Sequence, residues 1–562
     1  MIQLDGTTKS LEAALNTLEI YGSISGLKVN TEKTHIAWIG KKKHSKDKIY
    51  SQNHTWETVT EFKLLGIYFS VDLGRCMEAN YDNKKSEIRQ TINQWNKRFL
   101  TPLGKVTVIK TFLMSKVNHL FTALPNPKES YLNEITNMFY QFLWSGKPDK
   151  INRKTVELDY SHGGIKMLNL RNSITALKAT WFRRLFLDQS LDQPLWIVLF
   201  EKIYNTNVTK ICNFGIHYPE ILKKRSRNLF WKDVFDAWIQ ISNKQNYKNS
   251  RDVLVSPLWY NHKMSYREMY IPKWYQRGIV TISDIIDTTG TVMDIDTIKS
   301  VYNIDIINPL HYLRVKQNVK EFLKEYGIQP DTRVQRPFVP LYMKILLQSN
   351  KGASIFNSML KKENKNDHSV KQKWQMDLNV IVDDNMWKNI FNSCFKSVSN
   401  NILIWFQLKL IYRILGTKSY LHKVQLSDTD TCAMCGEKET IIHMFVECTY
   451  VKIIWSVIEK YIKQQININV TFSILDILFG YCFNNQNKIP IDAIILITKK
   501  YIFDIKFRSS ANFHFNFDVL KYKFSQTYKD EKYSATLNNG QKKFDAVWTN
   551  WKSVFCSQSV II

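Results

Sequence analysis

The sequence predicts a mainly helical protein (α+β) with one small antiparallel sheet near its amino terminus. Three observations support this fold class. Apolar residues recur at helical spacing over much of the 562 residues, β-forming residues gather between positions 34 and 70, and only 19 Gly and 13 Pro interrupt the chain. Hydrophobic residues make up 44% of the sequence, which excludes a disordered or collagen-like protein.

The individual elements follow from local patterns. Apolar residues at helical spacing predict a first helix over residues 10–21, with Gly22 as its stop. Strand-forming residues occupy 34–40 and 62–69, and Gly66 lies in the middle of the second strand. Further helical stretches are expected at residues 81–124, 131–144, 374–424 and 494–507.

The charge balance points to a polyanionic partner. The chain carries 78 Lys and Arg against 50 Asp and Glu, so its formal charge is 78 − 50 = +28. Such an excess of like charge repels itself unless a polyanion is near, which makes nucleic acid the leading partner. Between residues 84 and 116, eight cations accompany a single acid, Glu87. This ratio favours contact with a nucleic-acid backbone over an ordinary solvated helix pair. The eight cations are Lys84, Lys85, Arg89, Lys97, Arg98, Lys105, Lys110 and Lys116.

A second lysine cluster, at positions 41–43, 46 and 48, is open to two interpretations. It is either a solvated loop or a loop that follows phosphates. The chain has neither an apolar run of about 18 residues nor a secretory signal. We therefore expect an intracellular protein, in the nucleus or in a cytoplasmic ribonucleoprotein, with no membrane partner and no small-molecule substrate.

Residues 190–360 combine short apolar runs with scattered tryptophans. Aromatic side chains can stack on bases, but at this irregular spacing they favour packing in a hydrophobic core. The polar segment Lys361–Lys373 lacks large hydrophobic residues and is predicted to be a linker. The tryptophans are Trp196, Trp231, Trp238, Trp259 and Trp274.

Four residues of metal-binding type lie close together in the segment CAMCGEKETIIHMFVEC. Two residues separate Cys432 from Cys435, and four separate His443 from Cys448, so the members of each pair can face one cation. Three sulfurs and one nitrogen complete a tetrahedral shell, which predicts a closed structural zinc site. The alternative is a buried histidine among reduced thiols.

Catalytic carboxylates are harder to find. A polymerase needs at least two Asp side chains that converge on paired divalent ions. The only adjacent pair, Asp383 and Asp384, opens a helical stretch and is interpreted as a helix cap. A nuclease-like series falls partly within a predicted buried helix, which disfavours nuclease chemistry. That series comprises Pro490, Asp492, Asp504 and Lys506.

The order of these features resembles LINE-type (non-LTR) retrotransposon reverse transcriptases. The resemblance covers nearly the whole chain and is most specific in the first 180 residues and around 402–455. It rests on SGLKVNTEKT at 25–34, FKLLGIYF at 62–69, the basic helical region, FLW at 142–144, Gly163 with Gly164, and the Cys/Cys/His/Cys set.

The resemblance implies four domains and a role for several residues. Lys33, with Lys28 as a rival, matches a lysine that is thought to help protonate the leaving pyrophosphate. Leu65, Gly66 and Ile67 match a hairpin that grips the primer end. The implied domains are a residual palm at 1–72, a helical thumb at 73–190, a connecting region at 191–373, and a zinc-bearing terminal domain at 374–562.

The chain also departs from the family. The family's catalytic turn, an aromatic residue followed by Ala, Asp and Asp, lies upstream of the segment that resembles MIQLDGTTKS, and Asp5 lies beyond that turn. The resemblance therefore implies a protein that binds RNA, DNA or their hybrid but lacks the catalytic Asp pair and the magnesium site. Two alternatives remain: an active reverse transcriptase whose upstream coding sequence is missing here, and a host-adopted protein that uses its zinc domain to dock a protein or nucleic acid.

Overall fold

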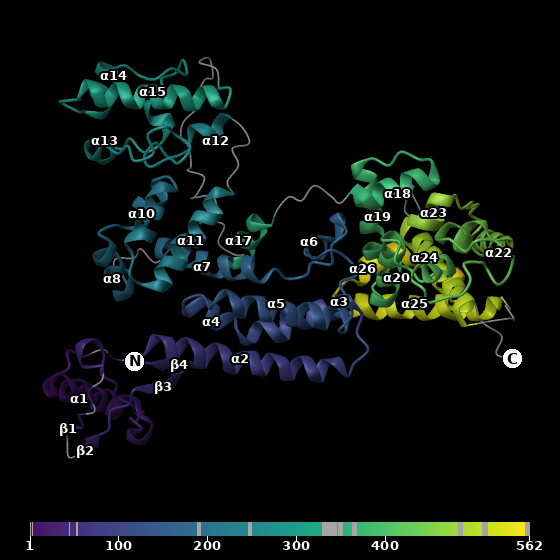
Figure 1. Cartoon of the computed structure of the whole chain (residues 1–562), viewed down its shortest axis with the longest axis horizontal. Coiled ribbons are helices and arrows are strands. Elements are labelled where there is room, and N and C mark those ends of the chain that lie inside the picture. Colours follow the sequence, from purple (N-terminus) through teal and green to yellow (C-terminus); the bar gives the residue numbers. More distant parts are fainter. Residues whose placement is uncertain are drawn as a thin grey trace. The chain divides into compact units, whose positions relative to one another are not determined.

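A computed structural model shows a mainly helical chain, which confirms the predicted fold class (Figure 1). Among the described residues, the strands form two antiparallel sheets of two strands each. None of the helices in this described part combines the length and the hydropathy that crossing a bilayer requires. The structure describes residues 2, 4–43, 45, 47–51, 54–187, 193–244, 250–328, 346, 352–361, 368–480, 487–508 and 515–556.

The chain divides into two compact units, here called unit 1 and unit 2. Each unit is built from three separate stretches of sequence. Helices α2 (Leu73–Asn96) and α5 (Glu129–Trp144) contribute residues to both units, so the segment predicted to be a thumb, 73–190, also divides between them. Unit 1 comprises residues 1–91, 113–135 and 170–362, and unit 2 comprises residues 92–112, 136–169 and 363–562.

The first helix of unit 1, α1 (Thr8–Ser25), is longer than the predicted 10–21. The Thr7 side chain caps its first turn, and Gly26 ends it at φ +73° with its N–H bonded to the Gly22 carbonyl. The predicted stop at Gly22 is therefore wrong. A helix tolerates glycine in its interior, and only the later glycine adopts the left-handed conformation that ends a helix.

The segment 62–69, predicted as one strand, is a hairpin. Strands β3 (Glu61–Leu64) and β4 (Ile67–Ser70) pair in antiparallel register. Leu65 and Gly66 form the two-residue turn at φ +48° and +81°, the combination of positive angles that matches the right-handed twist of a hairpin. Gly66, which the sequence places in the middle of a strand, therefore lies in the turn of a hairpin.

The strand predicted at 34–40 is wrong. Within the described residues, its ladder contact is an isolated bridge between Ile36 and Thr58. The other hairpin lies later, where β1 (Ile49–Ser51) pairs with β2 (His54–Trp56). β-forming residues stabilise a strand only where a partner strand packs against them, and none of the described strands pairs with 34–40 along its length.

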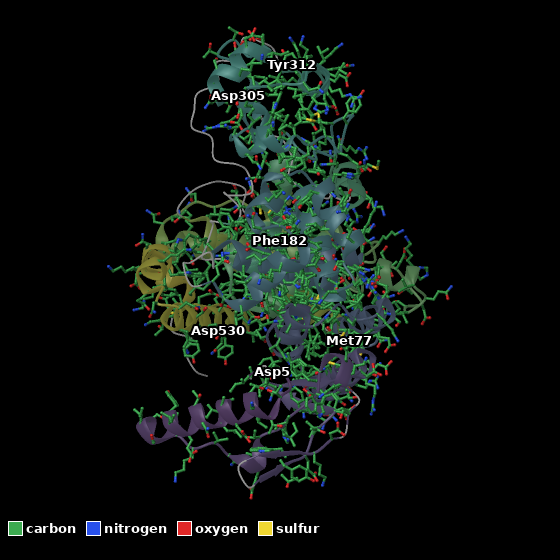
Figure 2. The ribbon with its side chains drawn as sticks, turned by 90° about the vertical axis from the view of Figure 1, so that its left-hand side faces the viewer. Asp5, Met77, Phe182, Asp305, Tyr312 and Asp530 are labelled. Carbon is green, nitrogen blue, oxygen red and sulfur yellow. The ribbon has the colours of Figure 1, made fainter. Side chains whose placement is uncertain are left out.

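The centre of unit 1 is helix α7 (Leu170–Leu187), which packs against α11 (Leu229–Asn243) and α17 (Ala353–Leu360) (Figure 1). Phe182, labelled in Figure 2, is fully buried and stacks on Trp238 with ring centroids 4.8 Å apart. Unit 1 also contains α4 (Asn118–Ala123), α8 (Leu195–Tyr204), α9 (Val208–Asn213), α10 (His217–Arg225), α12 (Ser250–Leu254), α13 (Pro272–Gln276), α14 (Ile295–Tyr302) and α15 (Pro309–Glu325).

The tryptophans of the connecting region pack into two hydrophobic clusters of unit 1. Trp238 is buried in the cluster around α7, and half-buried Trp196 and Trp231 pack against that cluster. Trp259 and Trp274 are buried in the second cluster. The prediction that these residues serve core packing is confirmed.

Unit 2 is organised around the buried helix α24 (Lys488–Arg508), which confirms the helix expected at 494–507. It packs against α19 (Asp384–Ser397), α20 (Asn401–Ile411) and α25 (Phe517–Leu537). Unit 2 also contains α3 (Pro102–Val108), α6 (Arg153–Val156), α21 (Lys418–Lys423), α22 (Thr449–Ile466), α23 (Ile474–Phe479), α26 (Gln541–Trp548) and α27 (Lys552–Phe555).

The predicted linker Lys361–Lys373 is wrong in its second half. Helix α18 begins at His368 and runs to Leu378, whereas residues 362–367 lie outside the described residues. The polar composition is compatible with a helix because Lys371 pairs with Asp384 at 2.7 Å and Trp374 is buried.

Candidate metal site and nucleic-acid surface

The four residues of the predicted zinc motif meet in unit 2. One ligand atom from each of Cys432, Cys435, His443 and Cys448 lies within 4.8 Å of the other three. Cys435 is partly exposed, whereas the other three residues are buried. Among the described residues, these four form a group of His and Cys side chains that are close enough to hold one metal ion.

A tight turn presents the first two cysteines. The backbone N–H of Cys432 bonds to the Glu437 carbonyl at 2.7 Å, and the N–H of Gly436 bonds to the Cys432 carbonyl at 2.9 Å. Gly436 has φ +79°, a conformation that other residues rarely adopt. The glycine directly after Cys435 therefore lets the chain turn back while both sulfurs face the same point.

A single π-helical turn, His443–Glu447, presents the other two ligands. The N–H of Cys448 bonds to the His443 carbonyl at 3.1 Å, which is a bond over five residues. The Cys448 carbonyl in turn accepts the N–H of Val451 at 2.9 Å and so begins α22. The extra residue of the π turn brings both side chains to the same side.

The geometry of the four residues fits zinc. The Cys435 Sγ lies 3.2 Å from the His443 Nε2 and 4.0 Å from the Cys448 Sγ. Bond lengths of about 2.3 Å to sulfur and 2.0–2.1 Å to nitrogen place the ligands of a tetrahedral zinc about 3.5–3.8 Å apart. Three sulfurs and one nitrogen would complete the shell and leave no position for water or substrate.

The thiols also influence one another's protonation. A hydrogen bond with Cys448 lowers the pKa of the Cys432 thiol, and the same contact, together with burial, raises the pKa of Cys448. A zinc ion needs thiolates, so its binding releases the protons that remain on the sulfurs.

Two further side chains, Lys506 and Glu439, lie beside the cluster. The sequence patterns did not connect them with it. The Lys506 Nζ lies 3.5 Å from the Cys432 Sγ and 3.8 Å from a carboxylate oxygen of Glu439. The sequence groups Lys506 with the nuclease-like series, whereas the structure places it beside the cysteines. Because 74 residues separate Lys506 from Cys432, no local pattern in the sequence could connect them.

Among the described residues, the acidic side chains singled out in the sequence do not converge as a nuclease or polymerase centre requires. The Asp383 carboxylate accepts the N–H of Met386 at 2.7 Å and caps α19, as predicted. Asp492 and Asp504 lie 504 − 492 = 12 residues apart on one helix, which separates them by about 18 Å along its axis. They are too far apart to bind the same ion.

The eight predicted cations divide equally between the units. Lys84, Lys85, Arg89 and Lys116 belong to unit 1, and the other four belong to unit 2. The prediction is wrong for Lys105, whose side chain is buried. The Lys105 Nζ donates to the Phe142 carbonyl at 2.9 Å and to the Ser145 hydroxyl at 2.6 Å, so this ammonium holds two segments of unit 2 together.

Several cations of unit 1 are neutralised locally. Lys84 pairs with Glu87 at 2.8 Å, and Lys116 lies 3.9 Å from the same carboxylate. Lys85 pairs with Glu134 at 3.0 Å. The count of cations along the sequence missed Glu134 because it lies on α5. Arg89 is exposed.

In unit 2, exposed cations and aromatic rings lie close together in the sequence, in a group of residues here called the Trp95 patch. The Arg98 guanidinium lies over the Trp95 ring at 4.7 Å, and the Trp95 and Phe112 rings lie 5.1 Å apart. Phe112 is 49% exposed and Phe99 is fully exposed. Residues 92–112 include no acid. The patch comprises Trp95, Lys97, Arg98, Phe99, Lys110 and Phe112.

The residues implied by the resemblance lie in the amino-terminal part of unit 1. Lys28 and Lys33 are exposed. Leu65 is 91% exposed at the hairpin turn and Ile67 is buried beneath it. Asp5, labelled in Figure 2, is exposed and accepts the N–H of the neighbouring Thr7 at 2.8 Å. Their roles at a primer end remain predictions.

The lysine cluster at 41–48 is partly described. The side chains at 41–43 are exposed, Lys42 lies over the Trp38 ring at 4.8 Å, and Lys48 pairs with Glu57 at 3.1 Å. Lys46 lies outside the described residues. Both interpretations of this cluster, as a solvated loop or as a phosphate contact, stay open.

Comparison with known families identifies one segment of the chain. Residues 368–455 match the family model described as zinc-binding in reverse transcriptase. The matched segment contains all four clustered ligands. The carboxy-terminal region is therefore related to reverse transcriptases.

Proposed function

We propose that this chain is the carboxy-terminal part of a LINE-type (non-LTR) retrotransposon reverse transcriptase, that it holds one structural zinc ion, and that it binds RNA, DNA or their hybrid. The observation that carries the proposal is the meeting of four ligand atoms inside the segment that matches the reverse-transcriptase zinc-binding family. The order of sequence features before this segment supports the LINE type and a thumb in residues 73–190.

The metal part of the proposal assigns Cys432, Cys435, His443 and Cys448 to zinc. When bound, the ion would cross-link the turn at 432–437 to the start of α22, which stabilises the fold without supplying an open coordination position. The chain's own residues supply three thiolates and one neutral imidazole.

Elemental analysis of the purified full chain tests this assignment. We expect one zinc per chain, and we expect Cys448→Ser to lose the metal and to lower the unfolding temperature. Cys212→Ser is the matched control, because that cysteine is buried in unit 1 and lies outside the cluster. A chain that folds normally without bound zinc would contradict the assignment.

The nucleic-acid part of the proposal rests on the Trp95 patch. Exposed cations can contact phosphates, and exposed aromatic rings can stack on bases without selecting a sequence. Both kinds of side chain are exposed within residues 95–112, and the stretch 92–112 contains no acid. A backbone contact of this kind favours affinity over sequence specificity.

The salt dependence of binding tests the patch directly. We expect the triple variant Lys97→Ala/Arg98→Ala/Lys110→Ala to reduce the slope of log affinity against log salt by about 2–3, because each phosphate contact contributes roughly 0.7–0.9. Fluorescence anisotropy with a labelled oligonucleotide measures this slope.

A charge-matched control separates a contact from a general loss of charge. Lys529→Ala/Lys532→Ala/Lys543→Ala removes three exposed cations elsewhere in unit 2. The control should retain the wild-type slope within about one. Equal slopes for the two triple variants would contradict the role of the patch.

We assign binding rather than nucleotide addition to this chain, and no magnesium site. Asp383 caps a helix, and Asp492 and Asp504 are about 18 Å apart on α24. The purified full chain should not extend a primer on an RNA template in the presence of magnesium. Incorporation of nucleotides under these conditions would refute this part of the proposal.

A further inference from the structure

The side chain of Lys506 is buried, so its ammonium group needs charged or hydrogen-bonding partners. Its side chain is 3% exposed, and a buried charge is costly unless it is paired or hydrogen-bonded. The Lys506 Nζ lies 3.5 Å from the Cys432 Sγ and 3.8 Å from a carboxylate oxygen of Glu439. Lys506 lies on α24, beyond the segment 368–455 that matches the zinc-binding family.

Glu439 is itself held by the turn that carries the cysteines. Its carboxylate accepts the N–H of Lys418, the first residue of α21, at 3.0 Å, and its own N–H bonds to the Asp430 carbonyl at 2.8 Å. Its side chain is 7% exposed. The ammonium of Lys506 therefore lies between a fixed carboxylate and a metal ligand.

The charges of the metal site explain why an ammonium group is favourable at this position. A zinc ion with three thiolates and a neutral imidazole carries a net charge of −1. The buried ammonium of Lys506 offsets part of the negative charge of this cluster and of Glu439, and it donates a hydrogen bond to one of the sulfurs. Partners of this kind orient first-shell ligands, and their removal typically costs about 10–100-fold in metal affinity.

We propose that Lys506 is a positioning residue of the metal site, which donates to the Cys432 thiolate and thereby joins α24 to the zinc-dependent fold. This inference rests on the proposed zinc binding. It extends the metal-dependent structure about fifty residues beyond the matched segment. Loading the metal should therefore protect α24, and not only the turn at 432–437, from hydrogen exchange.

Cobalt titration of the full chain tests the proposal, because Co²⁺ reports its ligands by absorption. Lys506→Met removes the charge and keeps a similar length. We expect its Co²⁺ and Zn²⁺ affinities, measured in competition with a chelator, to fall about 10–100-fold. The sulfur-to-cobalt charge-transfer band should move to lower energy, since the thiolate loses a hydrogen bond. Lys521→Met, which removes a surface lysine paired with Asp518, should leave both readouts unchanged.

A second variant separates positioning from folding. Lys506→Met leaves the Glu439 carboxylate buried without its cation, which can destabilise unit 2. In Lys506→Met/Glu439→Gln that charge is also removed, and we expect the double variant to bind Co²⁺ about 10–100-fold more weakly than Glu439→Gln alone, with the shifted band retained.

The outcomes are distinguishable. A wild-type chain that binds no Co²⁺ or Zn²⁺ would refute the metal site and this inference together. A wild-type chain that binds metal while Lys506→Met keeps its affinity and spectrum would refute the inference alone. An affinity restored in the double variant, with an unshifted band, would also refute it, because the loss would then come from the buried carboxylate.

Discussion

Lys499 should make the stability of unit 2 depend on pH in the alkaline range. It is buried on α24, where its Nζ donates to the Gln407 side-chain oxygen at 2.7 Å and to the Leu478 carbonyl at 3.0 Å. Burial lowers the pKa of Lys499 from 10.5 to about 7, against an opposing effect of Asp492. The folded chain therefore releases this proton more readily than the unfolded chain does.

The sign and size follow from proton linkage. Between pH 7 and 10.5 the unfolded state holds one more proton than the folded state, so the free energy of unfolding rises with pH. One proton corresponds to about 1.4 kcal/mol per pH unit, or roughly 2–3 kcal/mol between pH 7.5 and 9.5. Below pH 7 both states are protonated and this dependence ends.

Lys499→Met removes the titrating group and should flatten the dependence in unit 2. Pulse-labelling hydrogen exchange in increasing urea, read on peptides from α24, gives the unfolding midpoint of this region. Peptides from α7 are an internal control, because burial also lowers the pKa of Lys178 to about 7 in unit 1 and that lysine is unchanged. The same rise of stability with pH in wild-type and variant α24 would refute the reasoning.

Three further substitutions test individual contacts. Lys105→Met should leave the salt dependence of oligonucleotide binding unchanged, because this ammonium is bonded to the Phe142 carbonyl and lies away from solvent. Gly164→Ala should lower the free energy of unfolding by about 1–3 kcal/mol in a urea titration, because its Cβ would lie 1.9 Å from the Leu158 carbonyl oxygen. Asp383→Ala should lose the cap of α19, which costs about 1 kcal/mol in the same titration.

Each of these three substitutions has a control variant or an outcome that would contradict its interpretation. A reduced salt slope in Lys105→Met would place this ammonium at the nucleic acid after all. Asp383→Asn should retain most of the cap, since Asn caps as well as Asp. Gly104→Ala should be tolerated, because its nearest side-chain neighbour lies at 3.5 Å. Equal losses at both glycines would contradict the steric argument.

Local patterns predicted what depends on neighbours in sequence. The zinc ligands lie within 17 consecutive letters, and their spacing alone brings them together. The cap at Asp383 and the buried helix near 494–507 likewise follow from adjacent residues. Tryptophans of the connecting region pack in cores, as their irregular spacing indicates.

Local patterns did not predict properties that depend on residues far apart in the sequence. Lys105 has a helical position and a charge typical of a surface, yet its partners lie 37 and 40 residues later. Glu134 neutralises Lys85 from 49 residues away, so counting charges along one stretch overstated the free positive charge. The strand expected at 34–40 does not form, because a strand needs a partner strand and residue propensities alone do not supply one.

The π-helical turn between the last two metal ligands limits how this segment can change in length. His443 and Cys448 meet because one extra residue is accommodated within a single turn. A deletion there would restore the ordinary α-helical repeat and rotate the second ligand by about 100° around the axis, since 3.6 residues complete a turn. A change of even one residue in the length of this turn would therefore separate the start of α22 from the cluster.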